Sequence, residues 1–347
     1  MNASSYSVAF RKKFNKLKSE CLLKSCFHED NQCSDKIIKA HSIQNNKILN
    51  KLSEDGHVLM YTAAIGNEFD LVTTMKKEGR SKATTFSGFC GFHDKELFRA
   101  IEDGDYVVGN KEQEFLFAYR ALAKEYFTKK TTTEMYKRMY SLAGSSNYEK
   151  INEFFGVIAK PTREDLIDIS GMLSAHLLGC EDAGKRLELY RERMNYYLDN
   201  QNFDEIVTEV IELSKEHLIA VSSITFLERD LEENIINDLS DFQISLAPLF
   251  ITVFPQDGKT YVLLSYFKRN ALRYKFIKKQ ILNKTEVEQR EIISSIVMNY
   301  CENFAVSPIK WKEIDEETRP KYDKKYRESL YEVDKRLSTE EKLNLFI

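Results

Sequence analysis

Residues 85–94 read TFSGFCGFHD, and an apolar helical pattern follows over residues 97–101. Cys90 and His93 lie in this segment with two residues between them, close enough for both side chains to reach one metal ion. The glycine-containing residues favour a turn before the pair, and the apolar pattern favours a helix after it. We therefore expect this segment to carry half of a metal site at the start of a helix.

Cysteine and histidine are concentrated in the same part of the chain. There are six of each, and four of each lie in the first hundred residues. Thiolate and imidazole are the usual ligands of structural zinc, which takes four of them in a tetrahedron. We predict a structural zinc site in which Cys26 and Cys33 supply the other two ligands from a loop. The alternative is that these residues are buried free thiols, a common state of cysteine. Cys180 and Cys301 lie far from the cluster, and we expect both to be buried thiols.

The composition of the chain is that of a folded globular protein. It has 347 residues, of which 42% are hydrophobic and 30% charged, enough for a sizeable core. With 13 Gly and 5 Pro, it is neither collagen-like nor a Pro/Gly-rich disordered chain. The net charge of -3 argues against a generally cationic surface for nucleic acid. No apolar run reaches the roughly 18 residues that span a bilayer, and no secretory signal precedes the fold. We therefore expect a soluble, cytoplasmic protein with no membrane partner.

The middle of the chain has the apolar spacing of long helices. One helical pattern covers residues 111–143 and is broken by the GSSN of 144–147. Thr162 precedes two acidic residues and a second apolar pattern, which is typical of a helix start. We predict one or two long helices over 163–199.

The last third of the chain changes to strand-like segments. Runs rich in β-branched and aromatic residues predict strands, and an Asp257–Gly258 step between the last two predicts a hairpin. Helices are expected to return afterwards. The predicted strands are 217–227, 249–254 and 260–267, and the predicted helices are 283–300 and 324–346.

These patterns indicate an α+β fold that is predominantly helical. We predict a zinc-binding module over 1–105, a helical region over 106–210 and an α+β C-terminal region over 211–347. The last two regions alternatively form one domain.

The motifs of the first third occur in a particular order. After Cys26 and Cys33 come KIIKAHSIQ at 36–44, GHV at 56–58 and KATTFSGFCGFHDKELF at 82–98. This order resembles a family of bacterial zinc-binding proteins of HNH-like, treble-clef character, which are largely uncharacterised and associated with anti-phage defence. The resemblance covers residues 21–103. It implies a treble-clef module with a structural zinc.

The resemblance also implies roles for individual residues. In HNH-type nucleases a histidine at the end of the first strand is the general base on water, and a divalent ion held from the helix stabilises the phosphate. His41 occupies the position of that base, and Asp94 that of a residue that helps to bind a catalytic Mg²⁺ or Mn²⁺. The alternative for His41 is a core residue that orients a metal ligand. We expect His57 to be a hydrogen-bonded residue at the end of an element. The implied zinc ligands are Cys26, Cys33, Cys90 and His93.

Two functions follow for the whole chain. The first is an HNH-like metal-dependent nuclease, or a degenerate relative of one, acting in bacterial anti-phage defence. The second is a non-enzymatic, zinc-stabilised sensor or scaffold that binds a protein partner. Residues 110–347 carry no recognisable catalytic motif that would decide between them.

Two further features bear on possible partners. A basic run with interleaved aromatic residues can grip phosphates and stack bases, or it can be a solvated amphipathic face. Glu114 and Arg120 on the first long helix are expected at the helix surface or in interdomain contacts, with a buried polar pair or a contact to the zinc module as the alternative. The basic run contains Lys268, Arg269, Arg273, Tyr274, Phe276 and Lys278.

Overall fold

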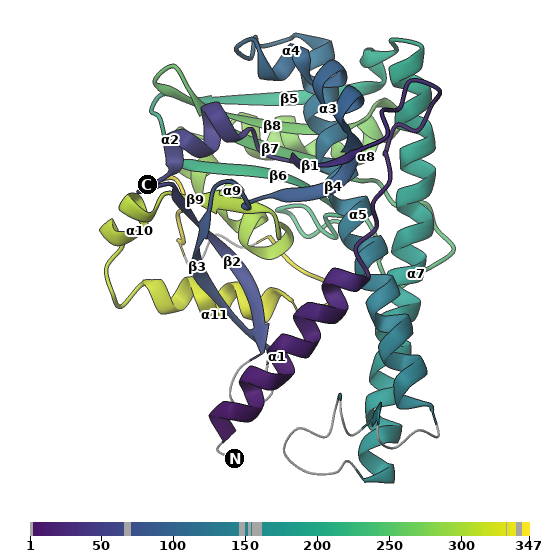
Figure 1. Cartoon of the computed structure of the whole chain (residues 1–347). Helices are drawn as coiled ribbons and strands as arrows, with labels where there is room; N and C mark the ends of the chain where they lie inside the picture. Colours follow the sequence, from purple (N-terminus) through teal and green to yellow (C-terminus); the bar gives the residue numbers. More distant parts are fainter. Residues whose placement is uncertain are drawn as a thin grey trace.

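A computed structural model describes residues 3–65, 71–145, 150–151, 154, 162–330, 332–337 and 342–347 (Figure 1). Helices and strands are mixed, as the sequence predicted. None of the described helices has an apolar stretch long enough to cross a membrane.

The centre of the molecule is a seven-stranded sheet in which every described pairing is antiparallel. The predicted hairpin is confirmed: Asp257 and Gly258 have φ angles of 52° and 78°, the left-handed backbone that a tight two-residue turn requires. The strands at His57–Ile65, Leu71–Gly79 and Ile206–Leu213 were not predicted. Thr85–Cys90 is also a strand, so the turn expected before Cys90 and His93 was wrong: these residues pair with Ile37–His41, a contact between distant segments. The order in the sheet is β3 (Leu71–Gly79), β2 (His57–Ile65), β9 (Phe304–Val306), β6 (Ile219–Thr225), β7 (Leu249–Gln256), β8 (Lys259–Phe267) and β5 (Ile206–Leu213).

Both faces of the sheet are buried. Alternate residues of each central strand point to opposite faces, and each face packs in its own apolar core. On β7, Leu249, Ile251 and Val253 pack with helix α9 (Glu286–Tyr300). Phe250 faces the other way, into the core formed by the two long helices. The strand therefore reads as a continuous apolar run, as expected for a strand between two helical layers.

The two long helices are α5 (Lys111–Ala143) and α7 (Arg163–Asp199), and they lie side by side along one face of the sheet (Figure 1). Both agree with the predicted ranges. Thr162 caps α7 with a capping box, its hydroxyl accepting from the backbone N–H of Asp165 while that carboxylate accepts from the backbone of Thr162.

The first third begins with helix α1 (Ala3–Glu20) and contains a separate two-stranded ladder of β1 (Ile37–His41) and β4 (Thr85–Cys90). Its register pairs Ile37 with Cys90 and His41 with Thr85, so Cys90 and His41 lie at opposite ends of the ladder. The helical pieces around it are a π-helical turn (Asn45–Leu49), α2 (Asn50–Leu52), α3 (Gly91–Leu97) and α4 (Arg99–Glu102).

The end of the chain differs from the prediction of a helix over 324–346. Helix α11 (Arg319–Ser329) ends early, and residues 332–337 and 342–347 are not helical. The reason is tertiary: Leu345 and Phe346 are buried in the sheet core, and the Asn344 carbonyl accepts from the Tyr322 hydroxyl at 2.8 Å. The remaining described helical pieces are two 3-10 turns (Phe203–Glu205 and Lys268–Asn270), α8 (Ala271–Tyr274), a π-helical turn (Ile277–Leu282) and α10 (Pro308–Glu313).

The three predicted parts share their cores. Phe27 and Phe89 from the first third pack with Tyr119 of α5 and with Phe250 of β7 in one apolar cluster. The central sheet also takes strands from both sides of the boundaries at 105 and 210. The division into 1–105, 106–210 and 211–347 stays a prediction.

Candidate metal centre

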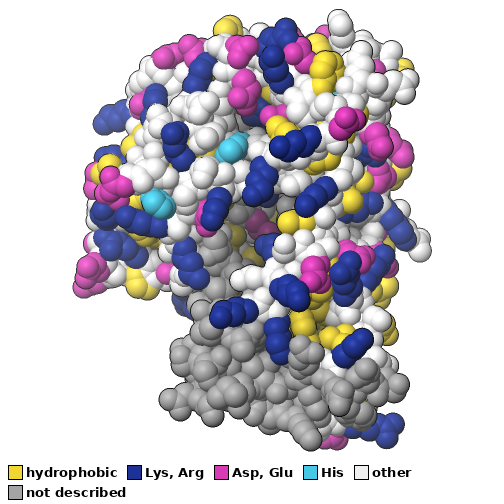
Figure 2. All heavy atoms as spheres, in the orientation of Figure 1, with side chains coloured by type: hydrophobic (Ala, Val, Ile, Leu, Met, Phe, Trp, Pro, Cys, Tyr) yellow, Lys and Arg dark blue, Asp and Glu magenta, His cyan; other side chains and the backbone are white. Residues whose placement is uncertain are grey.

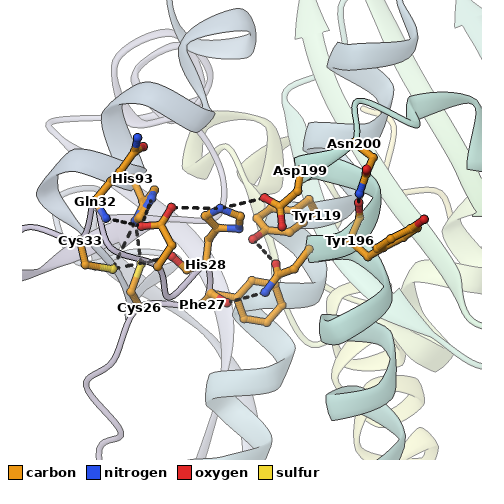
Figure 3. Close-up of polar contacts among 12 residues, drawn as sticks. Cys26, Phe27, His28, Gln32, Cys33, His93, Tyr119, Tyr196, Asp199 and Asn200 are labelled. Atoms are coloured by element: carbon orange, nitrogen blue, oxygen red, sulfur yellow. Dashed lines mark hydrogen bonds and ion pairs between the residues drawn. The ribbon is translucent and has the colours of Figure 1, made fainter.

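The four predicted ligands meet in one place. Nδ1 of His93 lies 3.3 Å from Sγ of Cys26, 3.5 Å from Sγ of Cys33 and 3.3 Å from Sγ of Cys90 (Figure 3 shows the first two contacts). The four ligand atoms all lie within 4.8 Å of one another. Two stretches that are far apart in the sequence thus converge on a site that can hold a metal ion.

Local structure explains how each pair of ligands is presented. Cys90 ends β4 and caps helix α3, its Sγ accepting from the backbone N–H of His93 at 3.4 Å, so that both ligands come from the first helical turn. Between the other two cysteines the chain turns tightly at Asp30, whose carboxylate accepts from the backbone N–H of Gln32 at 2.7 Å. This turn brings Cys33 back towards Cys26.

The thiols of the site differ in acidity. Burial raises the pKa of Cys26 to about 12. Burial also opposes ionisation of Cys90, but hydrogen bonds from the backbone of His93 and from Ser34 outweigh it and lower the pKa of Cys90 to about 6. Burial disfavours the charged thiolate form of these cysteines. A cation beside them would stabilise the thiolates, so ionisation of the buried thiols is coupled to cation binding.

A second layer of side chains surrounds the imidazole of His93. Nε2 of His93 lies 3.3 Å from the Asp30 carboxylate. The ring of His28 packs edge-on against it, and Nε2 of His28 lies 3.3 Å from the carboxylate of Asp199 at the end of α7 (Figure 3). His28, Asp30 and His93 form the second close grouping of potential ligands among the described residues. No role was predicted for His28 or Asp30. The signal that could have indicated Asp30 is its position between two predicted ligands, Cys26 and Cys33.

The loop between the cysteines is fixed to the long helices. The carbonyl of Phe27 accepts from Nε of Arg191 at 2.8 Å and from Nδ2 of Asn195 at 3.1 Å. The Tyr119 hydroxyl in turn donates to Oδ1 of Asn195 at 2.6 Å (Figure 3). The loop between Cys26 and Cys33 and the helical layer therefore form one hydrogen-bonded unit.

His41 lies at the end of β1, as predicted. Its Nε2 lies 3.2 Å from the carbonyl oxygen of Arg80, and the side chain is half-buried. Because a carbonyl only accepts, Nε2 carries the proton and Nδ1 is the basic nitrogen of the neutral ring. Burial lowers the pKa of His41, although the Arg80 carbonyl and the carboxylates of Glu102 and Asp94 act in the opposite direction.

Asp94 lies on α3, directly after the ligand His93, and is also half-buried. Burial raises the pKa of Asp94, and the neighbouring Arg120 opposes the rise. Arg120 is 3% exposed, makes an ion pair of 2.7 Å with Glu102 and stacks over the ring of Phe98 at 3.9 Å. His41, Asp94, Glu102 and Arg120 thus form a charged group distinct from the cysteine cluster.

The structure also describes Glu114, Arg120 and His57, three further residues considered in the sequence. Glu114 and Arg120 are both buried, but they do not pair with each other: Glu114 binds Lys111 at 2.8 Å, and Arg120 contacts the first third of the chain. Neither side chain lies at the helix surface. The ion pair of Arg120 with Glu102 is a contact between the predicted regions 1–105 and 106–210, as both the expectation of interdomain contacts and the alternative of a contact to the module allowed. His57 is exposed and hydrogen-bonds the carbonyl of Asp55 at 2.9 Å.

Cys180 and Cys301 are buried free thiols, as predicted.

The basic-aromatic run does not offer aromatic rings for stacking. Tyr274 and Phe276 are 0% and 5% exposed and belong to the sheet core, so these two rings are not available for base stacking, one of the two interpretations of the run. Lys278 forms an ion pair with Glu209 at 3.3 Å, and Arg273 donates to the carbonyl of Ser245 at 3.0 Å. Lys and Arg side chains are instead spread across the face drawn in Figure 2.

Comparisons with family models, with curated proteins and with solved structures find no match for this chain.

Proposed function

We propose that Cys26, Cys33, Cys90 and His93 bind a structural zinc ion. A tetrahedral zinc with bonds of about 2.3 Å to sulfur and 2.0 Å to nitrogen separates these atoms by about 3.5 Å. The sulfur-to-Nδ1 distances of 3.3, 3.5 and 3.3 Å agree with that separation. Four protein ligands leave no position for substrate, which favours a structural rather than a catalytic ion.

The arrangement around these ligands supports a treble-clef module. A loop supplies two cysteines, an antiparallel pair of strands follows, and the first turn of the next helix supplies the other two ligands. Residues 42–84, which include the β2–β3 hairpin, are inserted between the two strands.

We propose that the module is an HNH-like, metal-dependent nuclease centre. The observation that carries this is the contact between His41 and the carbonyl of Arg80. It fixes the tautomer in which Nδ1 is free to take a proton from water, and burial keeps the ring neutral by lowering the pKa of His41. A neutral, oriented histidine at the end of the first strand is what a general base at this position requires.

Asp94 is the candidate ligand for the divalent ion. It lies near enough to His41 for each to affect the ionisation of the other, and Glu102 lies in the same group. Among the described residues, neither carboxylate belongs to a close grouping of three potential ligands. Mg²⁺ and Mn²⁺ at such sites use one or two carboxylates and complete their shell with water and substrate phosphate. Asp94 fits that kind of site.

A second candidate function is a zinc-stabilised scaffold without catalysis. The observation that favours it is the position of Arg120, whose guanidinium already neutralises Glu102 beside the predicted catalytic group. In this case the zinc would serve only to hold the loop of Phe27 against the long helices.

Nuclease assays separate the two functions. Single- and double-stranded DNA and RNA are incubated with the wild-type protein and Mg²⁺ or Mn²⁺, and with the variants His41→Ala and Asp94→Asn. His57→Ala is the matched control, because His57 is exposed and lies outside the charged group. We expect cleavage by wild type and the control, and a loss of at least about a hundredfold in His41→Ala, as for removal of a general base.

Equal inactivity of all four proteins on every substrate would favour the scaffold.

The role in defence against phage is part of the same proposal. It predicts that cells producing the wild-type protein reduce phage plating more than cells producing His41→Ala at equal protein level.

A further inference from the structure

Helix α7 carries two seven-residue patterns on opposite sides. Leu166, Leu173, Cys180, Leu187 and Met194 are buried against the rest of the molecule. The residues of the other side belong to none of the described cores, and α7 is the long helix nearest this edge of the molecule (Figure 1). Residues 242–244 pack beside its middle, where the carbonyls of Phe242 and Ile244 accept from Arg186. On that side Leu178, Leu189 and Tyr196 are 63%, 59% and 60% exposed.

The exposed side has the spacing of a coiled-coil seam. Alternating steps of four and three residues connect its members, which is the pattern that keeps one helix face against a partner helix. Gly171 belongs to this seam, and a Cβ there would meet nothing within 4 Å, so no contact among the described residues calls for glycine. Glycine in a helix interior costs about 1 kcal/mol relative to alanine. The seam consists of Gly171, Ala175, Leu178, Asp182, Lys185, Leu189, Glu192 and Tyr196.

The seam is complementary to itself. If two copies of α7 pack antiparallel about a two-fold axis between residues 183 and 184, Leu178 of each copy meets Leu189 of the other. In the same register Asp182 meets Lys185, an acid opposite a base, and the large Tyr196 meets Gly171. The fourth pair places the small Ala175 opposite Glu192, which is exposed. Lys185 is exposed and forms no ion pair among the described residues. The carboxylate of Asp182 is held in place by an ion pair within the helix, with Nε of Arg186 2.7 Å from its Oδ2.

We propose that this face of α7 binds a second copy of the same chain, forming an antiparallel two-fold dimer. Charge complementarity argues for a second copy over an unrelated partner, because one register matches apolar with apolar, acid with base and large with small. Polar pairs at the centre of such a seam fix the register and the orientation of the helices. The proposal is independent of whether the module cleaves nucleic acid.

Sedimentation analysis of the full, metal-loaded chain over a wide range of concentration tests the proposal. We expect a reversible monomer–dimer equilibrium. Leu178→Glu should weaken dimerisation about tenfold or more. Leu272→Glu changes the same residue type on α8, where the side chain is 82% exposed, and should leave dimerisation unchanged. Circular dichroism and metal content establish that each variant is folded.

Charge exchange tests the register. Asp182→Lys places like charges opposite each other and should weaken the dimer, as should Lys185→Asp. The double variant D182K/K185D restores opposite charges and should recover dimerisation. A chain that is monomeric at every concentration, a Leu178→Glu variant that dimerises like wild type, or a double variant that stays as weak as the single ones would each overturn the proposal.

Discussion

The carboxylate of Asp30 lies 3.3 Å from Nε2 of His93, while Nδ1 of the same ring faces the three thiols. A carboxylate in this position holds the proton on Nε2 and so leaves Nδ1 as the ligand atom. Asp30, which lies between the two loop cysteines, therefore orients a candidate ligand that comes from helix α3.

Replacing Asp30 should weaken metal binding. Asp30→Asn removes the charge that stabilises the Nε2 proton, and loss of such a partner typically lowers metal affinity by about 10- to 100-fold. Competition with a chromophoric chelator measures the affinity. Asp35→Asn is the matched control, since Asp35 is exposed in the same segment. Identical affinities for Asp30→Asn and wild type would show that Asp30 does not orient His93.

Metal removal should destabilise more than the module itself. Phe27 connects the loop to Arg191 and Asn195, so loss of the metal loosens contacts of the long helices as well. At free metal about 1,000 times the dissociation constant, binding contributes about 4 kcal/mol to the free energy of unfolding.

Elemental analysis and thermal unfolding check this. We expect one zinc per chain in wild type, none in Cys90→Ser, and a similar decrease in melting temperature from chelation and from the substitution. Cys301→Ser, which alters a buried thiol outside the cluster, should keep the full zinc content.

Gly88→Ala should destabilise the fold by about 1–3 kcal/mol, the usual effect of overpacking a core. A Cβ at Gly88 would lie 2.5 Å from Cε2 of Phe86 and 2.6 Å from Cδ2 of Phe127, and both rings are buried. Gly179→Ala in α7 is the control with the opposite sign, since a Cβ there meets nothing within 4 Å. It should stabilise by about 0.5–1 kcal/mol. Urea denaturation measures both, and equal effects would contradict the packing around Gly88.

Buried histidine should make the protein less stable in acid. Burial lowers the pKa of His217, which is 5% exposed and packs against Phe346. The unfolded chain then binds a proton at this histidine more readily than the folded protein does. The contribution of His217 to the free energy of unfolding is therefore fully present above the unfolded pKa of about 6.5 and decreases as the pH falls towards the folded pKa.

The variant His217→Gln should flatten this dependence between neutral pH and about pH 5, where model histidines titrate. Both proteins lose metal as the pH falls. The difference between their free energies of unfolding at each pH therefore reports the contribution of His217. A slope of unfolding free energy against pH that is the same in both would show that His217 does not contribute.

Features that depend on neighbouring residues were predicted well. The start of α7 at Thr162 and the end of α5 before Gly144 follow from capping groups and breakers within a few positions. The β7–β8 hairpin follows from its Asp257–Gly258 step. These signals act through local backbone conformation, which the order of residues defines directly.

Features that depend on distant partners were missed. The β2–β3 hairpin joins the sheet only because Leu59 pairs with Val306 near the other end of the chain. A helix was predicted over 324–346, yet burial of Leu345 and Phe346 in the sheet core outweighs the local helical preference at the end of the chain. A pattern read along the chain does not contain these contacts.

The sequence by itself determined which four side chains come together, because two close pairs of soft ligands in one segment have few other arrangements. Only the tertiary structure decided their surroundings: Asp30 against His93, Asp199 against His28, and Arg120 beside Glu102. The physical reason is that each of these contacts joins segments far apart in the sequence. Their proximity is set by how the helices and the sheet bury apolar surface together, and that free energy belongs to the whole chain.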